Sequence, residues 1–102
     1  MIDELERRRN EIENLCRRFR VRRLEVFGSA ATGAFRPEAS DVDFLVEFLN
    51  PEERGYSDRY FGLLESLEEL FARHVDLVVD AAIKNPFFRD SVDQTKKLLY
   101  AA

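Results

Sequence analysis

Two aspartates lie inside a segment that otherwise has the pattern of a β-strand, and this conflict constrains the fold more than any other feature. From Asp41 to Phe48, polar and apolar residues alternate as they do in a half-buried strand. Aspartate is depleted in strands, so two of them here need a reason. Residues two apart in a strand point to the same face, which puts Asp41 and Asp43 roughly 6.6 Å apart on one face.

The spacing of these carboxylates suits a divalent metal site. Magnesium–oxygen bonds are about 2.0–2.1 Å long, and paired catalytic metals lie about 3.5–4 Å apart. Two carboxylates at strand spacing can therefore span such a pair. Without a cation, mutual repulsion would disfavour the ionisation of both groups. The sequence thus predicts that Asp41 and Asp43 are metal ligands.

The apolar run that precedes these aspartates stops at Gly28 and Ser29. Because Gly28 has no Cβ, the backbone can turn sharply there and approach a ligand closely. If a helix begins near Ala30, Ser29 lies at its N-terminus, where free N–H groups favour phosphate. Gly28 and Ser29 therefore predict a phosphate-binding turn beside the metal-binding strand.

A third carboxylate, Asp76, stands near the start of Val75–Val79, a β-branched run that predicts a buried strand. Taken alone, Asp76 could equally be a turn residue. His74 precedes the same strand and could act as a base or contact phosphate. A lone histidine at a helix end more often caps carbonyl groups, so we leave His74 outside the predicted site. Asp80, at the far end of the strand, is interpreted as a turn residue.

The ordered motifs resemble those of the nucleotidyltransferase superfamily typified by DNA polymerase beta: Gly28-Ser29, eleven intervening residues, Asp41-Val42-Asp43 and the later Asp76. The whole chain is similar to the minimal nucleotidyltransferases (MNT), which are usually antitoxins paired with HEPN-domain toxins. The resemblance implies the polymerase beta-like fold, an α+β architecture in which helices pack on a small mixed sheet. Strand order and direction follow from the resemblance, since periodicity cannot give them.

The resemblance also implies a Mg²⁺-dependent enzyme that transfers AMP from ATP to a tyrosine hydroxyl of a partner HEPN ribonuclease toxin, and so neutralises it. Asp41 and Asp43 would hold two Mg²⁺ ions, and Asp76 would hold the ion nearer the attacking hydroxyl. Gly28 and Ser29 would hold the β- and γ-phosphates.

Two other functions stay open from the sequence alone. An antitoxin could neutralise its toxin by complex formation without catalysis, which is favoured by the small size and by Thr32, where the family often has an arginine. A nucleotidyltransferase that modifies a small molecule, of the aminoglycoside type, is also compatible with the motifs. Nothing in the sequence identifies tyrosine as the acceptor or adenine as the base.

The length of 102 residues suits a single domain, with an N-terminal helix over residues 1–20 and a core over residues 21–100. No apolar run reaches the roughly eighteen residues of a membrane helix, and no signal peptide pattern opens the sequence. The net charge of −4 argues against direct DNA binding. The single cysteine, Cys16, is expected to be a core residue. One cysteine cannot form an internal disulfide, which favours a cytoplasmic setting. The expected partners are a nucleoside triphosphate and a toxin in a hetero-oligomer.

Hydrophobic periodicity predicts helices near residues 2–19, 56–73 and 87–100, and strands near residues 22–27, 42–49 and 75–79. Asn85 and Pro86 predict the N-cap and first residue of the last helix. The segment 36–40 is interpreted as a surface loop. The aromatic residues Phe87, Phe88 and Tyr100 are assigned mainly to the core, with a partner-binding patch as the alternative.

Overall fold

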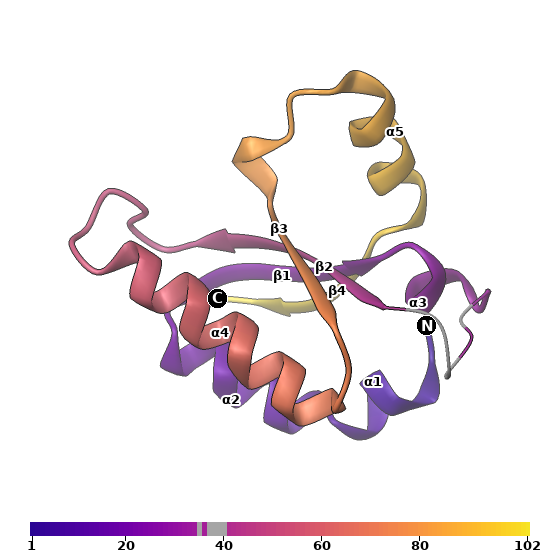
Figure 1. Cartoon of the computed structure of the whole chain (residues 1–102), viewed down its shortest axis with the longest axis horizontal. Coiled ribbons are helices and arrows are strands. Elements are labelled where there is room, and N and C mark those ends of the chain that lie inside the picture. Colours follow the sequence, from indigo (N-terminus) through magenta and orange to yellow (C-terminus); the bar gives the residue numbers. More distant parts are fainter. Residues whose placement is uncertain (35, 37–40) are drawn as a thin grey trace.

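A computed structural model describes residues 1–34, 36 and 41–102 of the chain (Figure 1). Of the loop predicted over residues 36–40, Arg36 is described and is exposed, and the rest of that prediction lies outside the described residues. Within the described part of the chain, no helix is both long enough and apolar enough to cross a membrane.

A four-stranded mixed sheet with the order β3-β2-β1-β4 forms the centre of the molecule. The strands are β1 (Val21–Phe27), β2 (Val42–Phe48), β3 (Val75–Val79) and β4 (Lys97–Ala101). Strand β1 runs antiparallel to both β2 and β4, whereas β2 runs parallel to β3. The predicted α+β architecture is confirmed, and the three predicted strands agree closely with β1, β2 and β3.

The main core lies on one face of the sheet, under α1 (Asp3–Arg7), α2 (Arg9–Arg18) and α4 (Tyr56–Phe71) (Figure 1). Successive strand side chains point to opposite faces, so every second strand residue enters this core. Its fully buried members include Leu5, Ile12, Cys16, Leu24, Val26, Phe44, Leu63 and Leu67. Burial raises the pKa of the Cys16 thiol to about 12, which agrees with the predicted core role.

The helix predicted over residues 2–19 is interrupted at Arg8, where φ is −102° and ψ is 14°. Backbone hydrogen bonds continue across this point, because Arg8 N–H donates to the Glu4 carbonyl and Ile12 N–H donates to the Arg8 carbonyl. The interruption is therefore a local change of helical twist. The second predicted helix ends at Phe71, because Ala72 adopts a left-handed conformation with φ of 51°.

The helix predicted over residues 87–100 is wrong beyond Thr95. Helix α5 spans Pro86–Thr95, Lys96 is extended (φ −61°, ψ 143°), and Lys97–Ala101 forms strand β4. Locally, Leu98-Leu99-Tyr100 suits a helix end or a strand. The strand forms because β4 supplies backbone hydrogen-bond partners to the edge of β1, which would otherwise be unpaired. Long-range pairing thus overrides the local pattern.

The opposite face of the sheet carries a smaller core, covered by the 3₁₀ helix η1 (Asp80–Ala82) and by α5 (Figure 1). Phe27, Leu45 and Val92 are its buried members, with Val78 and Ile83 packed beside them. Beside this core, Asp76 near the start of β3 is exposed, so that end of the sheet is accessible.

Helix α5 begins as predicted, because Asn85 Oδ1 accepts the N–H groups of Phe87 at 2.8 Å and Phe88 at 3.2 Å. The assignment of Phe87 to the core is wrong, since its side chain is 84% exposed. Phe88 is 39% exposed and makes an edge contact with Phe27 at 6.0 Å between ring centroids. Tyr100 packs against the main core. Adjacent helix positions point about 100° apart, so Phe88 faces the smaller core while Phe87 faces solvent.

Replacement of Leu99 by alanine should lower the free energy of unfolding by about 2–5 kcal/mol, because Leu99 is 2% exposed in the main core. The matched variant Leu98→Ala, at a position 45% exposed on the other face of β4, should lower it by less than about 1 kcal/mol. Urea unfolding followed by circular dichroism measures both values. Equal losses would contradict the strand assignment for residues 97–101.

Candidate functional site

The parallel pairing of β2 with β3 brings the predicted carboxylates together. Asp43 lies opposite Asp76 in the register, one residue after the pair Val42 and Val75. The Val42 N–H also donates to the carbonyl of the residue before β3, at 3.4 Å. Residues two apart in a strand share a face. The side chains placed on one face at this end of the sheet are therefore Asp41, Asp43, His74 and Asp76.

His74 lies among these carboxylates, although sequence reasoning left it outside the site. Its Nδ1 atom is 3.3 Å from Asp41 Oδ2 and 3.8 Å from Asp76 Oδ1. The candidate ligand atoms of Asp41, His74 and Asp76 all lie within 4.8 Å of one another. The signal that could have found His74 is its spacing, because His-x-Asp at the start of β3 repeats the Asp-x-Asp spacing at the start of β2.

The Asp43 carboxyl is half-buried and has a raised pKa. Partial burial is the largest cause, followed by a hydrogen bond with the Asp76 side chain and by the negative charges of Asp76 and Asp41. His74 acts in the opposite direction, and together these effects raise the pKa of Asp43 to about 6. Burial and the neighbouring carboxylates thus both favour the protonated form of Asp43, and a divalent cation would relieve the repulsion between the carboxylates.

Gly28 lies directly against Asp43. The preceding residue, Phe27, pairs with Asp43 across β1 and β2, and Gly28 then adopts a positive φ of 70°. A Cβ atom at Gly28 would lie 2.7 Å from Asp43 Oδ2, so any side chain there would displace this carboxylate. Glycine is therefore needed both for the turn and for the close approach of backbone to carboxylate.

The predicted phosphate-binding turn is only partly available. Helix α3 (Ser29–Thr32) is a single turn capped by Gly33, so its dipole is small. The Gly28 N–H already donates to Thr95 Oγ1 at 3.1 Å. Phosphate binding by Gly28 and Ser29 stays a prediction, and it would rest on the Ser29 hydroxyl and nearby backbone.

A cavity of about 440 Å³ opens beside the carboxylates. The Tyr60 hydroxyl donates to the Leu77 carbonyl at 2.6 Å, which fixes the Tyr60 ring in the cavity wall. The polar side of the cavity is formed by Asp43, His74 and Asp76, and the apolar side includes Phe27, Tyr60, Leu64 and Phe88. Charged and aromatic walls therefore meet in one cleft, an arrangement suited to an organic substrate with an anionic group and a bound cation.

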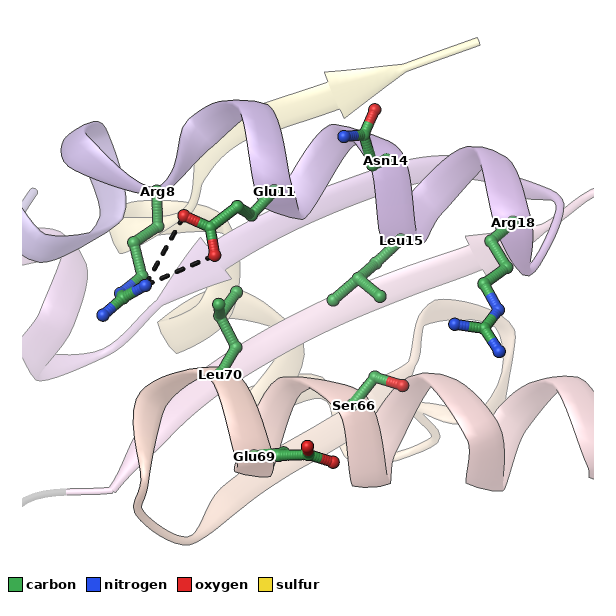
Figure 2. A pocket seen from close by; sticks show the side chains of 8 residues that line it. All are labelled: Arg8, Glu11, Asn14, Leu15, Arg18, Ser66, Glu69 and Leu70. Carbon is green, nitrogen blue, oxygen red and sulfur yellow. Dashed lines mark hydrogen bonds and ion pairs between the residues drawn. The ribbon is translucent and has the colours of Figure 1, made fainter.

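A second hollow, of about 530 Å³, lies between α2 and α4 (Figure 2). It shares no lining residue with the carboxylate cavity. Two of its charged residues, Arg8 and Glu11, already pair at 3.3 Å, and Arg18 lies over the ring of Phe19. Its lining residues are Arg8, Glu11, Asn14, Leu15, Arg18, Ser66, Glu69 and Leu70. This hollow offers no cluster of carboxylates, and we assign the chemistry to the cavity beside Asp43.

The residues of the cluster fit a divalent metal. Carboxylate oxygens are the donors that Mg²⁺ and Mn²⁺ prefer. The raised pKa of Asp43 comes first from partial burial and then from the neighbouring carboxylates, and a cation would oppose both effects. The glycine at position 28 leaves room for the carboxylate that a side chain would displace. A cation held here would face a cavity open to a phosphate-bearing ligand.

Comparisons with known proteins agree with this chemistry. A family model described as a nucleotidyltransferase domain matches residues 9–99. The Methanocaldococcus jannaschii protein named "Putative protein adenylyltransferase MJ1379" is 33% identical over 93 residues, which cover 91% of this chain and 89% of the relative.

Two solved structures have a similar fold. A structure of a "putative minimal nucleotidyltransferase" superposes with a TM-score of 0.72 at 35% identity, covering 91% of this chain and 90% of that chain. A chain in the structure of a tri-AMPylated Shewanella oneidensis HEPN toxin in complex with an MNT antitoxin gives a TM-score of 0.66 at 19% identity. The match covers 96% of this chain and 73% of that chain, and at this identity it bears on the fold alone.

The variant Asp43→Asn should stabilise the metal-free protein above about pH 6. Folding raises the pKa of Asp43 from its ordinary 3.8 to about 6, so the folded state binds more protons than the unfolded state in this window. Wild-type stability therefore falls as pH rises through it. Asparagine removes this loss, because its amide can donate to Asp76 as the protonated carboxyl does.

Thermal unfolding in EDTA from pH 4 to pH 8 measures the effect. The advantage of Asp43→Asn should be absent at the acid end and reach a plateau above about pH 6, with roughly 4–8 °C for each kcal/mol gained. Asp58→Asn, at an exposed position in the first turn of α4, is the matched control and should give no such gain. A variant less stable than wild type across the range would contradict carboxylate crowding at Asp43.

Proposed function

The chain belongs to the nucleotidyltransferase domain family, and from this premise we propose that it is a Mg²⁺-dependent protein adenylyltransferase. It would transfer AMP from ATP to a tyrosine hydroxyl of a partner HEPN ribonuclease toxin in the cytoplasm, and so act as the antitoxin of the pair. The observation that carries the proposal is the meeting of Asp41, Asp43 and Asp76 beside Gly28 at one end of β2 and β3.

The choice of a protein acceptor is supported by the relatives. The M. jannaschii relative is named as an adenylyltransferase that acts on protein. A chain with the same fold occurs in a complex with an AMPylated HEPN toxin. The cavity beside the carboxylates is open and has an aromatic wall that includes Tyr60 and Phe88, so a hydroxyl on a partner surface can reach the cluster from solvent.

Each site residue has a proposed task. Asp41 and Asp43 would hold two Mg²⁺ ions, and Asp76 would share the ion nearer the acceptor. When bound, the two ions would stabilise the entering and leaving oxygens of an in-line displacement. Ser29, with backbone at Gly28, would orient the β- and γ-phosphates. Gly28 also keeps the Asp43 carboxylate in place, because a side chain at position 28 would collide with it.

The proposed reaction balances without a covalent enzyme intermediate. The acceptor oxygen attacks the α-phosphorus, the bond from that phosphorus to the bridging oxygen breaks, and pyrophosphate leaves with the electron pair. Asp76 would accept the acceptor's proton and later release it to solvent. Its carboxylate is exposed at the cavity, so both transfers have a route.

Neutralisation by complex formation without catalysis is the second candidate function. It is favoured by the exposure of Phe87, whose ring is 84% accessible at the start of α5. Phe88 beside it is 39% exposed, and adjoining exposed aromatic side chains suit an interface. No described feature favours the aminoglycoside type of small-molecule transfer.

Intact-mass spectrometry of the co-purified partner tests the proposal. After incubation with ATP and Mg²⁺, wild type should add one or more AMP units to the partner, and peptide mapping should place them on tyrosine. Asp76→Asn should reduce the rate at least roughly 100-fold, because an electrostatic group at the reacting centre is lost. Asp58→Asn, the exposed control, should transfer AMP at the wild-type rate.

The outcomes separate the two candidate functions. A tight complex in which wild type adds no mass, and in which Asp76→Asn still protects cells from the toxin, would overturn the enzymatic proposal in favour of binding. AMP transfer at the wild-type rate in Asp76→Asn would show that the Asp76 carboxylate does not have the role proposed for it.

A further inference from the structure

We propose that His74 is a fourth ligand of the metal centre, and that its imidazole nitrogen tightens the binding of transition-metal ions such as Mn²⁺, Co²⁺ and Zn²⁺ relative to Mg²⁺. The inference rests on the metal site of the proposed function, and it adds a donor to the three carboxylates. It follows from register, distance and donor chemistry.

Register places His74 in a ligand position. Asp43 and Asp76 are paired residues in β2 and β3, and the hydrogen bond from Val42 N–H to the His74 carbonyl extends the pairing by one step. Asp41 and His74 therefore stand at matching positions, each two residues before an aspartate of the site. The Asp-x-Asp of one strand faces a His-x-Asp on its parallel neighbour, with all four side chains on one face.

The distances between the donor atoms suit a shared ion. Ligands at about 2.1 Å from a six-coordinate ion are separated by about 3.0 Å when adjacent and about 4.2 Å when opposite. His74 Nδ1 lies 3.3 Å from Asp41 Oδ2 and 3.8 Å from Asp76 Oδ1, within this range. The imidazole is 61% exposed, so its ring can rotate by the small amount needed.

A purely structural role explains His74 less well. Its contacts with Asp41 and Asp76 join side chains that are each about half exposed, and exposed ion pairs contribute little to stability. The side chain lines the cavity of about 440 Å³ and is not among the buried residues of either core. Its position therefore matters chiefly for what the cavity binds.

The donor type gives the predicted preference. Mg²⁺ binds oxygen and keeps several waters, so an imidazole adds little to its affinity. Imidazole suits first-row transition metals, whose affinities rise from Mn²⁺ toward Cu²⁺. A site of carboxylates plus one imidazole should therefore bind Co²⁺ and Zn²⁺ more tightly than a site of carboxylates alone, while Mg²⁺ affinity changes little.

The chain contains one histidine, which makes the test unusually direct. In tag-free protein loaded with Mn²⁺, pulsed electron paramagnetic resonance should detect a coupled imidazole ¹⁴N, and growth with ¹⁵N-histidine should change that coupling. Both signals should vanish in His74→Ala. Loss of a residue that only hydrogen-bonds to a metal ligand typically weakens metal binding about 10–100-fold. Because His74 would bind the metal directly, His74→Ala should weaken Co²⁺ and Zn²⁺ binding at least tenfold by titration calorimetry. Mg²⁺ affinity should change less than about threefold.

Asp58→Asn serves as the control and should keep both the nitrogen coupling and the affinities. Bound Mn²⁺ without imidazole coupling, or equal weakening of Mg²⁺ and Zn²⁺ by His74→Ala, would overturn the inference and leave the carboxylate site and AMP transfer standing. Failure of wild type to bind any of these ions would overturn the inference and the metal-dependent function together.

Discussion

The register of β2 against β3 is the constraint on which the candidate site depends. A shift of one residue would turn Asp76 to the opposite face and bury it in the main core. The apolar residues that alternate with the site residues resist this, because Val42, Phe44, Val75 and Leu77 all belong to that core. The same alternation that builds the core thus holds the carboxylates together on the other face.

Helix α4 supports this register from outside the sheet. β3 is an edge strand, and its outward backbone groups need partners. Glu68 Oε2 accepts the Val75 N–H at 3.3 Å, and the Tyr60 hydroxyl donates to the Leu77 carbonyl at 2.6 Å. Glu68 comes from the polar side of α4 and Tyr60 from its apolar side. The helix therefore both covers the core and holds the strand that carries Asp76, so the edge is not open for pairing along these groups.

Sequence patterns predicted the structure where it depends on residues within one strand or helix. They failed where it depends on contacts with a segment far away in the sequence. The spacing of Asp41 and Asp43 predicted a shared face because that is a property of one strand. His74 was missed because its place depends on the pairing of β2 with β3, whose partner residues are more than thirty positions apart in sequence. Residues 97–100 were assigned to a helix because their strand conformation depends on pairing with β1. The exposure of Phe87 likewise depends on which side of α5 faces the second core.

The Gly28 turn shows how the two layers combine at the site. Its conformation leaves space for Asp43, which belongs to the strand next to β1. Its N–H is held by Thr95, at the end of α5, whose hydroxyl lies near the Val92 carbonyl, and Val92 is anchored in the smaller core. The small core thus fixes the Gly28 turn through the hydrogen bond from Gly28 to Thr95, whereas the main core fixes the carboxylates through the register of the strands. A Gly-Ser pair in the sequence marks the position of the turn, but the shape of the turn depends on contacts with both layers, which the pair alone does not reveal.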